Sequence, residues 1–212
     1  MPIQRQVALK ILKLGMDTRE VVARFQQERQ TLALMDHPHI ARIFDAGSTP
    51  SGRPFIAMEL VRGVKLTRFC DEQNLTTESR LRLFLQVCEA VQHAHQKGII
   101  HRDLKPGNIF ILERGRKDFV KILDFGIAKV MAGTRESLSG GGANLPNLRA
   151  TATGTVLGTP EYLSPEQGAG EAFDARVDQY ALGCIMYEML TGQVPFRGNG
   201  PMSTLMKHLT EK

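Results

Sequence analysis

The sequence predicts an α+β fold with two lobes, a small β-rich one followed by a larger, mostly helical one. Three observations lead to this. Residues 1–61 contain short apolar runs of strand length, whereas in residues 62–212 apolar side chains recur at helical spacing. The 212 residues are 42% hydrophobic and 23% charged, which is ordinary for a globular protein.

The smaller unit should contain one helix among strands. Asp17 and Glu20 have the spacing of a capping box at the helix start, and Pro38 follows its end. In chain order, the expected elements are a strand at 7–12, a helix at 17–35, and strands at 40–46 and 54–58 around a turn at 48–52.

The larger unit should be mostly helical. The segment 131–155 is rich in Gly, Ser, Thr, Asn and Ala without periodicity, which predicts a long loop. The expected elements are a helix through 81–95, a hairpin of strands 109–112 and 119–123, and helices at about 174–192 and 203–209.

Charge, cysteine content and hydropathy limit the partners and the compartment that we expect. The net charge of +5 comes from scattered basic residues, so we expect no nucleic-acid partner. Cys70, Cys88 and Cys184 are odd in number and form no CxxC pair, which favours a reducing compartment. Without an apolar run of 18 residues or a signal-peptide pattern, we expect a cytoplasmic location, with a membrane anchor outside this segment left open.

Four polar residues suggest a site for phosphate and metal. Asp103 can accept or orient the proton of an incoming hydroxyl, and Lys105 can direct a cation at a transferring phosphate. Asn108 and Asp124 offer the hard oxygen ligands that Mg²⁺ prefers. His93 and His95, in contrast, are two apart on a helix and cannot chelate a metal together.

Five motifs in this order resemble the catalytic domain of protein kinases. They are Val-Ala-Leu-Lys at 7–10, Glu28 within a helix, His-Arg-Asp-Leu-Lys-Pro-Gly-Asn at 101–108, Asp-Phe-Gly at 124–126, and Ser-Pro-Glu at 164–166. Lys105 and Thr159 resemble the residues found at these positions in serine/threonine kinases. The stretch 158–167 looks like that of the bacterial, eukaryotic-like (Hanks-type) kinases. The resemblance implies a bilobal kinase fold that uses ATP and Mg²⁺ to phosphorylate a protein substrate.

The resemblance also implies roles for single residues. Lys10 would hold the α- and β-phosphates and pair with Glu28, while Asp124 and Asn108 would bind the metal. Around adenine, it implies Met58 as gatekeeper, backbone contacts from Glu59 and Val61, and a sandwich of the ring between Ala8 and Phe110. Phe125, His101 and Leu32 would stack in a column, and Asp178 would anchor the catalytic loop from below.

Regulation by loop phosphorylation is a further expectation. Arg102, beside Asp103, is a cation that a phosphate on the 131–155 loop could neutralise. Thr151 and Thr153 are the candidate sites, with Thr155 next, and Thr159 would position the substrate. A kinase dimer could serve autophosphorylation of this loop.

The sequence departs from the family at both ends. Only nine residues precede Lys10 and none is Gly, so we expect an incomplete small lobe that lacks the Gly-rich loop over the phosphates. The last helices of the larger lobe also look absent, which would leave Glu166 without its usual arginine. We therefore expect a partial kinase domain, 1–61 and 62–212, truncated at both ends.

Three functions remain open at this point. The leading one is a protein serine/threonine kinase. Its rival is a catalytically impaired kinase fragment that acts as a binding or regulatory module. A small-molecule kinase of the antibiotic-phosphotransferase kind shares the fold but typically lacks the Asp-Phe-Gly and Ser-Pro-Glu-Gln segments present here.

Overall fold

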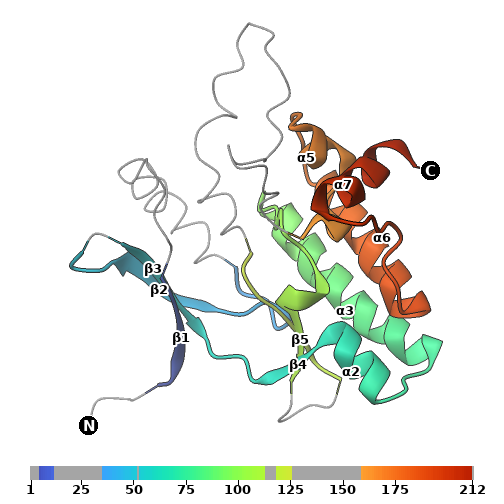
Figure 1. Cartoon of the computed structure of the whole chain (residues 1–212). Coiled ribbons are helices and arrows are strands. Elements are labelled where there is room, and N and C mark those ends of the chain that lie inside the picture. Colours follow the sequence, from blue (N-terminus) through green and yellow to red (C-terminus); the bar gives the residue numbers. More distant parts are fainter. Residues whose placement is uncertain (1–4, 12–34, 52, 113–117, 126–158, 212) are drawn as a thin grey trace, which may run out of the picture.

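The computed structural model describes residues 5–11, 35–51, 53–112, 118–125 and 159–211. In Figure 1 the strands β1 to β3 lie on one side of the molecule and most of the helices lie on the other. This is the α+β arrangement in two parts that the sequence predicts. Glu28, Leu32, Gly126, Thr151, Thr153 and Thr155 lie outside the described residues, as do the 131–155 loop and nearly all of the expected 17–35 helix.

The smaller part is built on an antiparallel three-stranded sheet in the order β1-β3-β2. Its strands are β1 (Val7–Ile11), β2 (Ile43–Ser48) and β3 (Pro54–Glu59). In β1, Ala8 and Lys10 are half-buried on one face and their neighbours are exposed on the other, as the period of two in a strand requires. The strand therefore directs Ala8 and Lys10 to the same side.

The strand expected at 40–46 begins three residues later, at Ile43. Ile40 instead makes an isolated parallel bridge with Ile122, in which the Ile122 N–H donates to His39 O at 2.8 Å and the Ala41 N–H donates to Ile122 O at 2.9 Å. Ile40 is 2% exposed and its side chain joins the main core of the larger part. Burial in that core, rather than strand propensity, decides its position.

A second three-stranded sheet has the order β4-β5-β6. Strands β5 (Ile109–Leu112) and β6 (Val120–Ile122) form the expected hairpin. Strand β4 (Gly63–Lys65) was not predicted, because three residues are too few to show a pattern. It pairs with β5 so closely that a Cβ at Gly63 would be 2.2 Å from the Ile111 carbonyl oxygen, so this position requires glycine.

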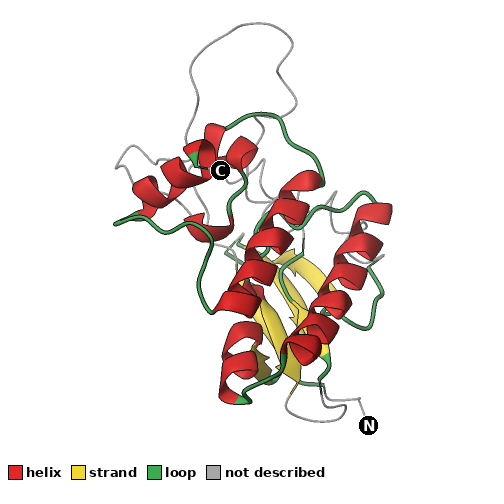
Figure 2. Ribbon diagram, turned by 90° about the vertical axis from the view of Figure 1, so that its right-hand side faces the viewer, coloured by secondary structure: helices red, strands yellow, loops and turns green. Residues whose placement is uncertain are grey.

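The helices form the other side of the molecule, as Figure 2 shows in red. The expected 81–95 helix begins earlier, because the Thr76 hydroxyl caps it by accepting from the Ser79 N–H. The helices are α2 (Leu66–Glu72), α3 (Thr77–Gln96), α5 (Pro165–Ala169), α6 (Arg176–Thr191) and α7 (Pro201–Thr210), with single 3₁₀ turns at Pro106–Asn108 and Pro160–Tyr162.

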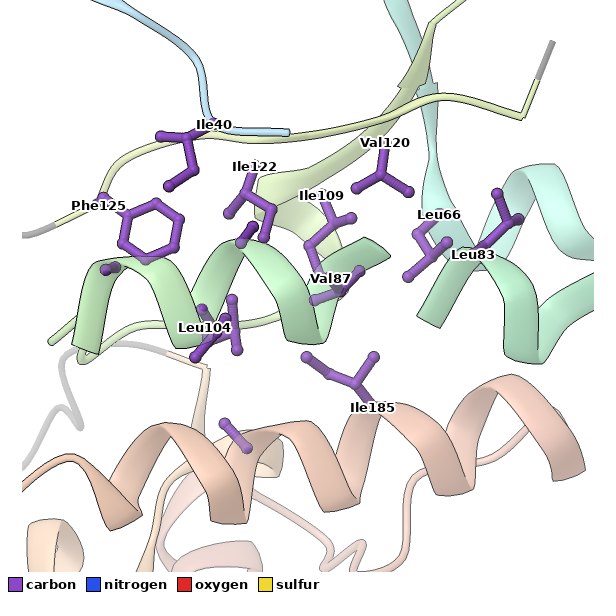
Figure 3. Close-up of a cluster of buried hydrophobic side chains, with 14 of the residues drawn as sticks. Ile40, Leu66, Leu83, Val87, Leu104, Ile109, Val120, Ile122, Phe125 and Ile185 are labelled. Atoms are coloured by element: carbon purple, nitrogen blue, oxygen red, sulfur yellow. The ribbon is translucent and has the colours of Figure 1, made fainter. Parts of the chain in front are cut away.

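The main hydrophobic core lies between α3, α6 and the second sheet. Figure 3 shows side chains from these elements pointing toward one another, with Val87 of α3 and Ile185 of α6 among them. The largest side chains of this core with almost no exposure are Ile40, Leu66, Leu83, Val87, Ile109, Ile111, Ile122, Ile185 and Met189. Burial at this density stabilises the segments between the strands and helices, including residues 101–108.

Among the described residues, none of the helices is long and apolar enough to cross a membrane.

Candidate active site

The segment 101–108 connects α3 to β5 and is held from below by one buried carboxylate. Asp178, in the first turn of α6, is 1% exposed. Its oxygens accept hydrogen bonds from the His101 N–H at 2.8 Å, the Arg102 N–H at 2.9 Å and His95 Nε2 at 2.7 Å. The anchoring role expected for Asp178 is therefore confirmed by its contacts.

These contacts also set the charge of Asp178. Burial alone would raise the pKa of its carboxyl, but the bonds from His95, His101 and Arg102 outweigh burial and hold the pKa below its ordinary value. Asp178 is therefore a carboxylate at neutral pH and accepts all three bonds.

Two residues of the site have left-handed backbone conformations. Arg102 has φ 69° and Asp124 has φ 65°. The other described non-glycine residues with positive φ are Asn74 and Asp118, residue types that tolerate this region in turns. For Arg102 the conformation costs energy and persists only because surrounding contacts enforce it, which is typical of functional sites.

His101 is fully buried and links the loop to the Asp-Phe-Gly segment. Its ring centroid lies 4.6 Å from that of Phe125 with the planes tilted by 58°, so the expected contact between the two rings is present. Nδ1 accepts from the Asp103 N–H at 3.3 Å, so Nε2 carries the proton and donates to Leu123 O at 3.0 Å. Burial lowers the pKa of His101, which keeps the ring neutral in this tautomer.

The carboxylate of Asp103 lies beside a cation and remains accessible. Lys105 Nζ donates to its two oxygens at 2.8 and 3.0 Å. The Asn108 side-chain amide donates to the Asp103 backbone carbonyl at 2.8 Å. Since the Asp103 side chain is 46% exposed, an incoming hydroxyl group can reach it.

The two parts of the molecule meet at Lys10 and Asp124. Lys10 Nζ lies 2.6 Å from Asp124 Oδ2, with side chains 40% and 28% exposed. Asp124 is placed near the catalytic loop because the Leu123 N–H donates to Asn108 O at 2.9 Å. The structure thus brings together Lys10, Asp124, Asn108, Asp103 and Lys105, all of which the sequence singled out.

The oxygen ligands present fit a magnesium ion that is shared with a phosphate. The Asn108 amide N–H₂ is used by the Asp103 carbonyl, which leaves its side-chain oxygen as the possible ligand beside the Asp124 carboxylate. The described residues contain no cluster of three or more His, Cys, Asp or Glu side chains that could hold a metal ion. Mg²⁺ is usually bound by one or two carboxylates and substrate phosphates, so such a cluster is not required.

The residues expected around adenine lie on β1, β3 and β5. Met58 is 4% exposed and belongs to a small core cluster against which Ala8 and Leu123 pack. Val61 follows β3, and Phe110 lies in β5 with its side chain half-buried.

Glu59, at the end of β3, has its N–H and side chain already engaged. The N–H donates to Arg42 O at 2.8 Å, and the carboxylate accepts from Lys121 Nζ at 2.8 Å. No sequence pattern indicates this ion pair, because the two residues are 62 positions apart.

The segment 159–169 contacts the catalytic loop. Thr159 and Gln167 line a small pocket together with Arg102, Asp103 and Leu104. The Gln167 side-chain amide donates to Arg102 O at 3.0 Å, a contact that sequence reasoning missed. The capping-box spacing of Ser164 and Gln167 was the only available signal. Glu166 has no side-chain ion pair with another described residue.

Comparison with known proteins identifies the family of the chain. Residues 2–212 match the family described as "Protein kinase domain". Serine/threonine-protein kinase PknB of Mycobacterium tuberculosis is 40% identical over 99% of this chain, and Pkn1 of Myxococcus xanthus is 41% identical over 97%. The matches cover 32% and 28% of those two proteins, so the chain spans about a third of their length.

The fold agrees with a solved structure. The crystal structure of a point mutant of the M. tuberculosis PknI kinase domain has a TM-score of 0.63 and 27% identity, and the match covers 92% of this chain and 67% of that one. The predicted bilobal fold and the resemblance to bacterial serine/threonine kinases are confirmed. The chain belongs to the protein kinase domain family.

Proposed function

We propose that the chain transfers the γ-phosphoryl group of ATP to serine or threonine hydroxyls of protein substrates. The single observation that carries this proposal is the Asp103 carboxylate, accessible and bonded to Lys105 on a loop fixed by Asp178. In this arrangement Asp103 orients the hydroxyl and accepts its proton, and Lys105 stabilises negative charge on the transferring group.

Asn108 and Asp124 are the proposed ligands of Mg²⁺, which when bound would neutralise charge on the phosphates. Lys10, whose ammonium group lies 2.6 Å from the Asp124 carboxylate, is the proposed partner of the α- and β-phosphates. Pairing of Lys10 with Glu28 stays a prediction.

For the adenine ring, we assign the contacts to Ala8, Met58, Phe110 and the backbone of Glu59 and Val61. Since the Glu59 N–H donates to Arg42 O, the adenine contact at Glu59 falls to its carbonyl oxygen. Burial of Met58 in a cluster against which Ala8 and Leu123 pack supports an apolar wall at this position.

The proposed class of substrate rests on Lys105 and on Thr159, which lies beside Arg102 and Asp103 in the same pocket. Activation through phosphorylation at Thr151, Thr153 or Thr155, autophosphorylation within a dimer, and the absence of a nucleic-acid partner stay predictions. The cytoplasmic location also stays a prediction.

A transfer assay on the 212-residue chain tests the proposed function. We expect label from [γ-³²P]ATP to pass to a serine- or threonine-containing protein such as myelin basic protein when Mg²⁺ is present. Asp103→Asn keeps the size of the side chain but removes the proton acceptor, so transfer should fall at least about a hundredfold. If the unaltered chain binds ATP yet transfers no more label than Asp103→Asn, the impaired-fragment alternative is correct.

A further inference from the structure

Gln167 forms a direct link between α5 and the catalytic loop. Its side-chain N–H donates to the carbonyl oxygen of Arg102 at 3.0 Å, although 65 residues separate the two. Gln167 follows Ser164-Pro165-Glu166 in the segment that begins at Thr159, the part of the chain that lines the pocket beside Asp103.

The accepting carbonyl belongs to the peptide that joins Arg102 to Asp103. The N–H of that peptide donates to His101 Nδ1 at 3.3 Å, so the peptide is held on both its sides. The left-handed φ of 69° at Arg102 makes such support necessary, because the conformation is costly for a residue other than glycine. Rotation of this peptide would turn the Asp103 side chain.

The orientation of the Gln167 amide is fixed by its own helix. Its Oε1 accepts from the Ser164 N–H at 3.4 Å and from the Ser164 hydroxyl at 3.3 Å, which completes a capping box. Since the oxygen is used there, the N–H₂ faces the Arg102 carbonyl. A carboxylate at the same position would place a negative charge against that carbonyl oxygen.

The helix that carries Gln167 is also firmly seated. At Gly168 an added Cβ would lie 2.5 Å from the Leu205 side chain of α7, so α5 and α7 are in close contact. The contact to Arg102 therefore comes from a packed element, and a shift of α5 would be transmitted to the catalytic loop.

We infer that Gln167 is a positioning residue that couples the segment at 159–169 to the orientation of Asp103. This inference rests on the proposed kinase function. Loss of the hydrogen bond should loosen the Arg102–Asp103 peptide and slow phosphoryl transfer without changing the proposed adenine contacts, which lie on β1, on β5 and on β3 with the residues that follow it. The expected signature is a lower kcat with an unchanged KM for ATP.

The test compares Gln167→Glu, Gln167→Ala and the control Gln193→Glu in the 212-residue chain. Gln193 is exposed after α6, so the control makes the same change of charge away from the site. We expect kcat to fall about tenfold in both Gln167 variants, as the loss of one hydrogen bond predicts, with the ATP KM within error of the unaltered chain and the melting temperature lowered by only a few degrees. Equal kcat for Gln167→Glu and Gln193→Glu would overturn the inference.

A second measurement separates this inference from the proposed function. Hydrogen exchange read by mass spectrometry on a peptide covering residues 99–108 requires no activity. Gln167→Glu should increase exchange there by at least threefold, whereas Gln193→Glu should not. If the unaltered chain transfers no phosphate but exchange increases, the proposed function fails and the coupling stands. Unchanged exchange contradicts the coupling whatever the activity.

Discussion

The ammonium group of Lys121 lies 2.8 Å from the carboxylate of Glu59 and joins the two sheets of the molecule. Glu59 ends β3 in the smaller sheet, and Lys121 is the central residue of β6 in the larger one. Lys121 is 8% exposed and donates also to Ile40 O at 3.2 Å. The backbone of Glu59 is also a proposed adenine contact, and Asp124 follows Lys121 by three residues.

Breaking this ion pair should affect stability and nucleotide affinity together. Lys121→Met leaves the Glu59 carboxylate partly buried without its cation, and we expect a loss of about 1–3 kcal/mol in the free energy of unfolding, measured in urea. The ATP KM should rise severalfold. Glu59→Gln combined with Lys121→Met should cost less than the sum of the two single changes, and strictly additive losses would show that the pair is not coupled.

Replacing Asp178 by Asn should destabilise the catalytic loop. A single amide oxygen cannot replace a carboxylate that accepts from three donors, so we expect a loss of about 2–4 kcal/mol in the free energy of unfolding. Asp36→Asn, whose side chain is 71% exposed, is the control and should change little.

Asp178→Asn should also change how the free energy of unfolding depends on pH in acid. Because the folded pKa of Asp178 is lowered, its stabilisation is fully present above the ordinary value of 3.8 and disappears as the pH falls through the folded pKa. Asp178→Asn should therefore have a shallower loss of stability below pH 4. Parallel pH profiles for the two proteins would argue against this assignment.

Protonation of His101 should make the free energy of unfolding depend on pH in a higher range than protonation of Asp178 does. Its folded pKa is lowered by burial, so the stabilisation is complete above the ordinary histidine value of 6.5 and is lost as the pH falls from there through the folded pKa. His101→Phe keeps an aromatic ring against Phe125 but cannot be protonated. We expect urea unfolding between pH 7.5 and 5 to show a smaller loss of stability in this variant.

His37 and His208 also have a pKa lowered by burial, and both remain in the variant. The difference between the two pH profiles therefore isolates His101. An identical slope in the unaltered chain and in His101→Phe would contradict its neutral, buried state.

Replacing Gly63 or Gly183 by Ala should change the stability of the fold in opposite directions. At Gly63 an added Cβ would lie 2.2 Å from a backbone carbonyl oxygen, so Gly63→Ala must displace β4 from β5 and should cost more than about 2 kcal/mol. Gly183 is exposed within α6 and has no atom within 4 Å of the added Cβ, so Gly183→Ala should stabilise by about 0.5–1 kcal/mol. Thermal unfolding of the two variants checks both signs.

The motifs of the catalytic site could be predicted because each is local in the chain. Asp103, Lys105 and Asn108 are within six residues of one another, and their chemistry is evident from residue type alone. Helix α3 was predicted because its apolar residues repeat over many turns, although its start depended on the cap at Thr76.

The contacts that hold these motifs in place could not be predicted in the same way. Glu59–Lys121 and Gln167–Arg102 depend on which distant elements the fold brings together, and neither pair has a periodic or compositional signal. Ile40 shows the same limit, because its place in the main core overrides a local pattern that favours a strand. Local chemistry was visible in the residues themselves, whereas the tertiary support that was expected, such as the anchor at Asp178, came only from the family resemblance.

The hydrogen bonds that Asp178 accepts from the loop and from His95 limit whether the catalytic loop could be transplanted into another protein. Its shape depends on a carboxylate from α6, which is itself bonded to a ring from α3. A transplanted copy of residues 101–108 would keep its left-handed turn only in a host whose two helices supply equivalents of His95 and Asp178. Any portable unit of this site must thus include both helices as well as the loop.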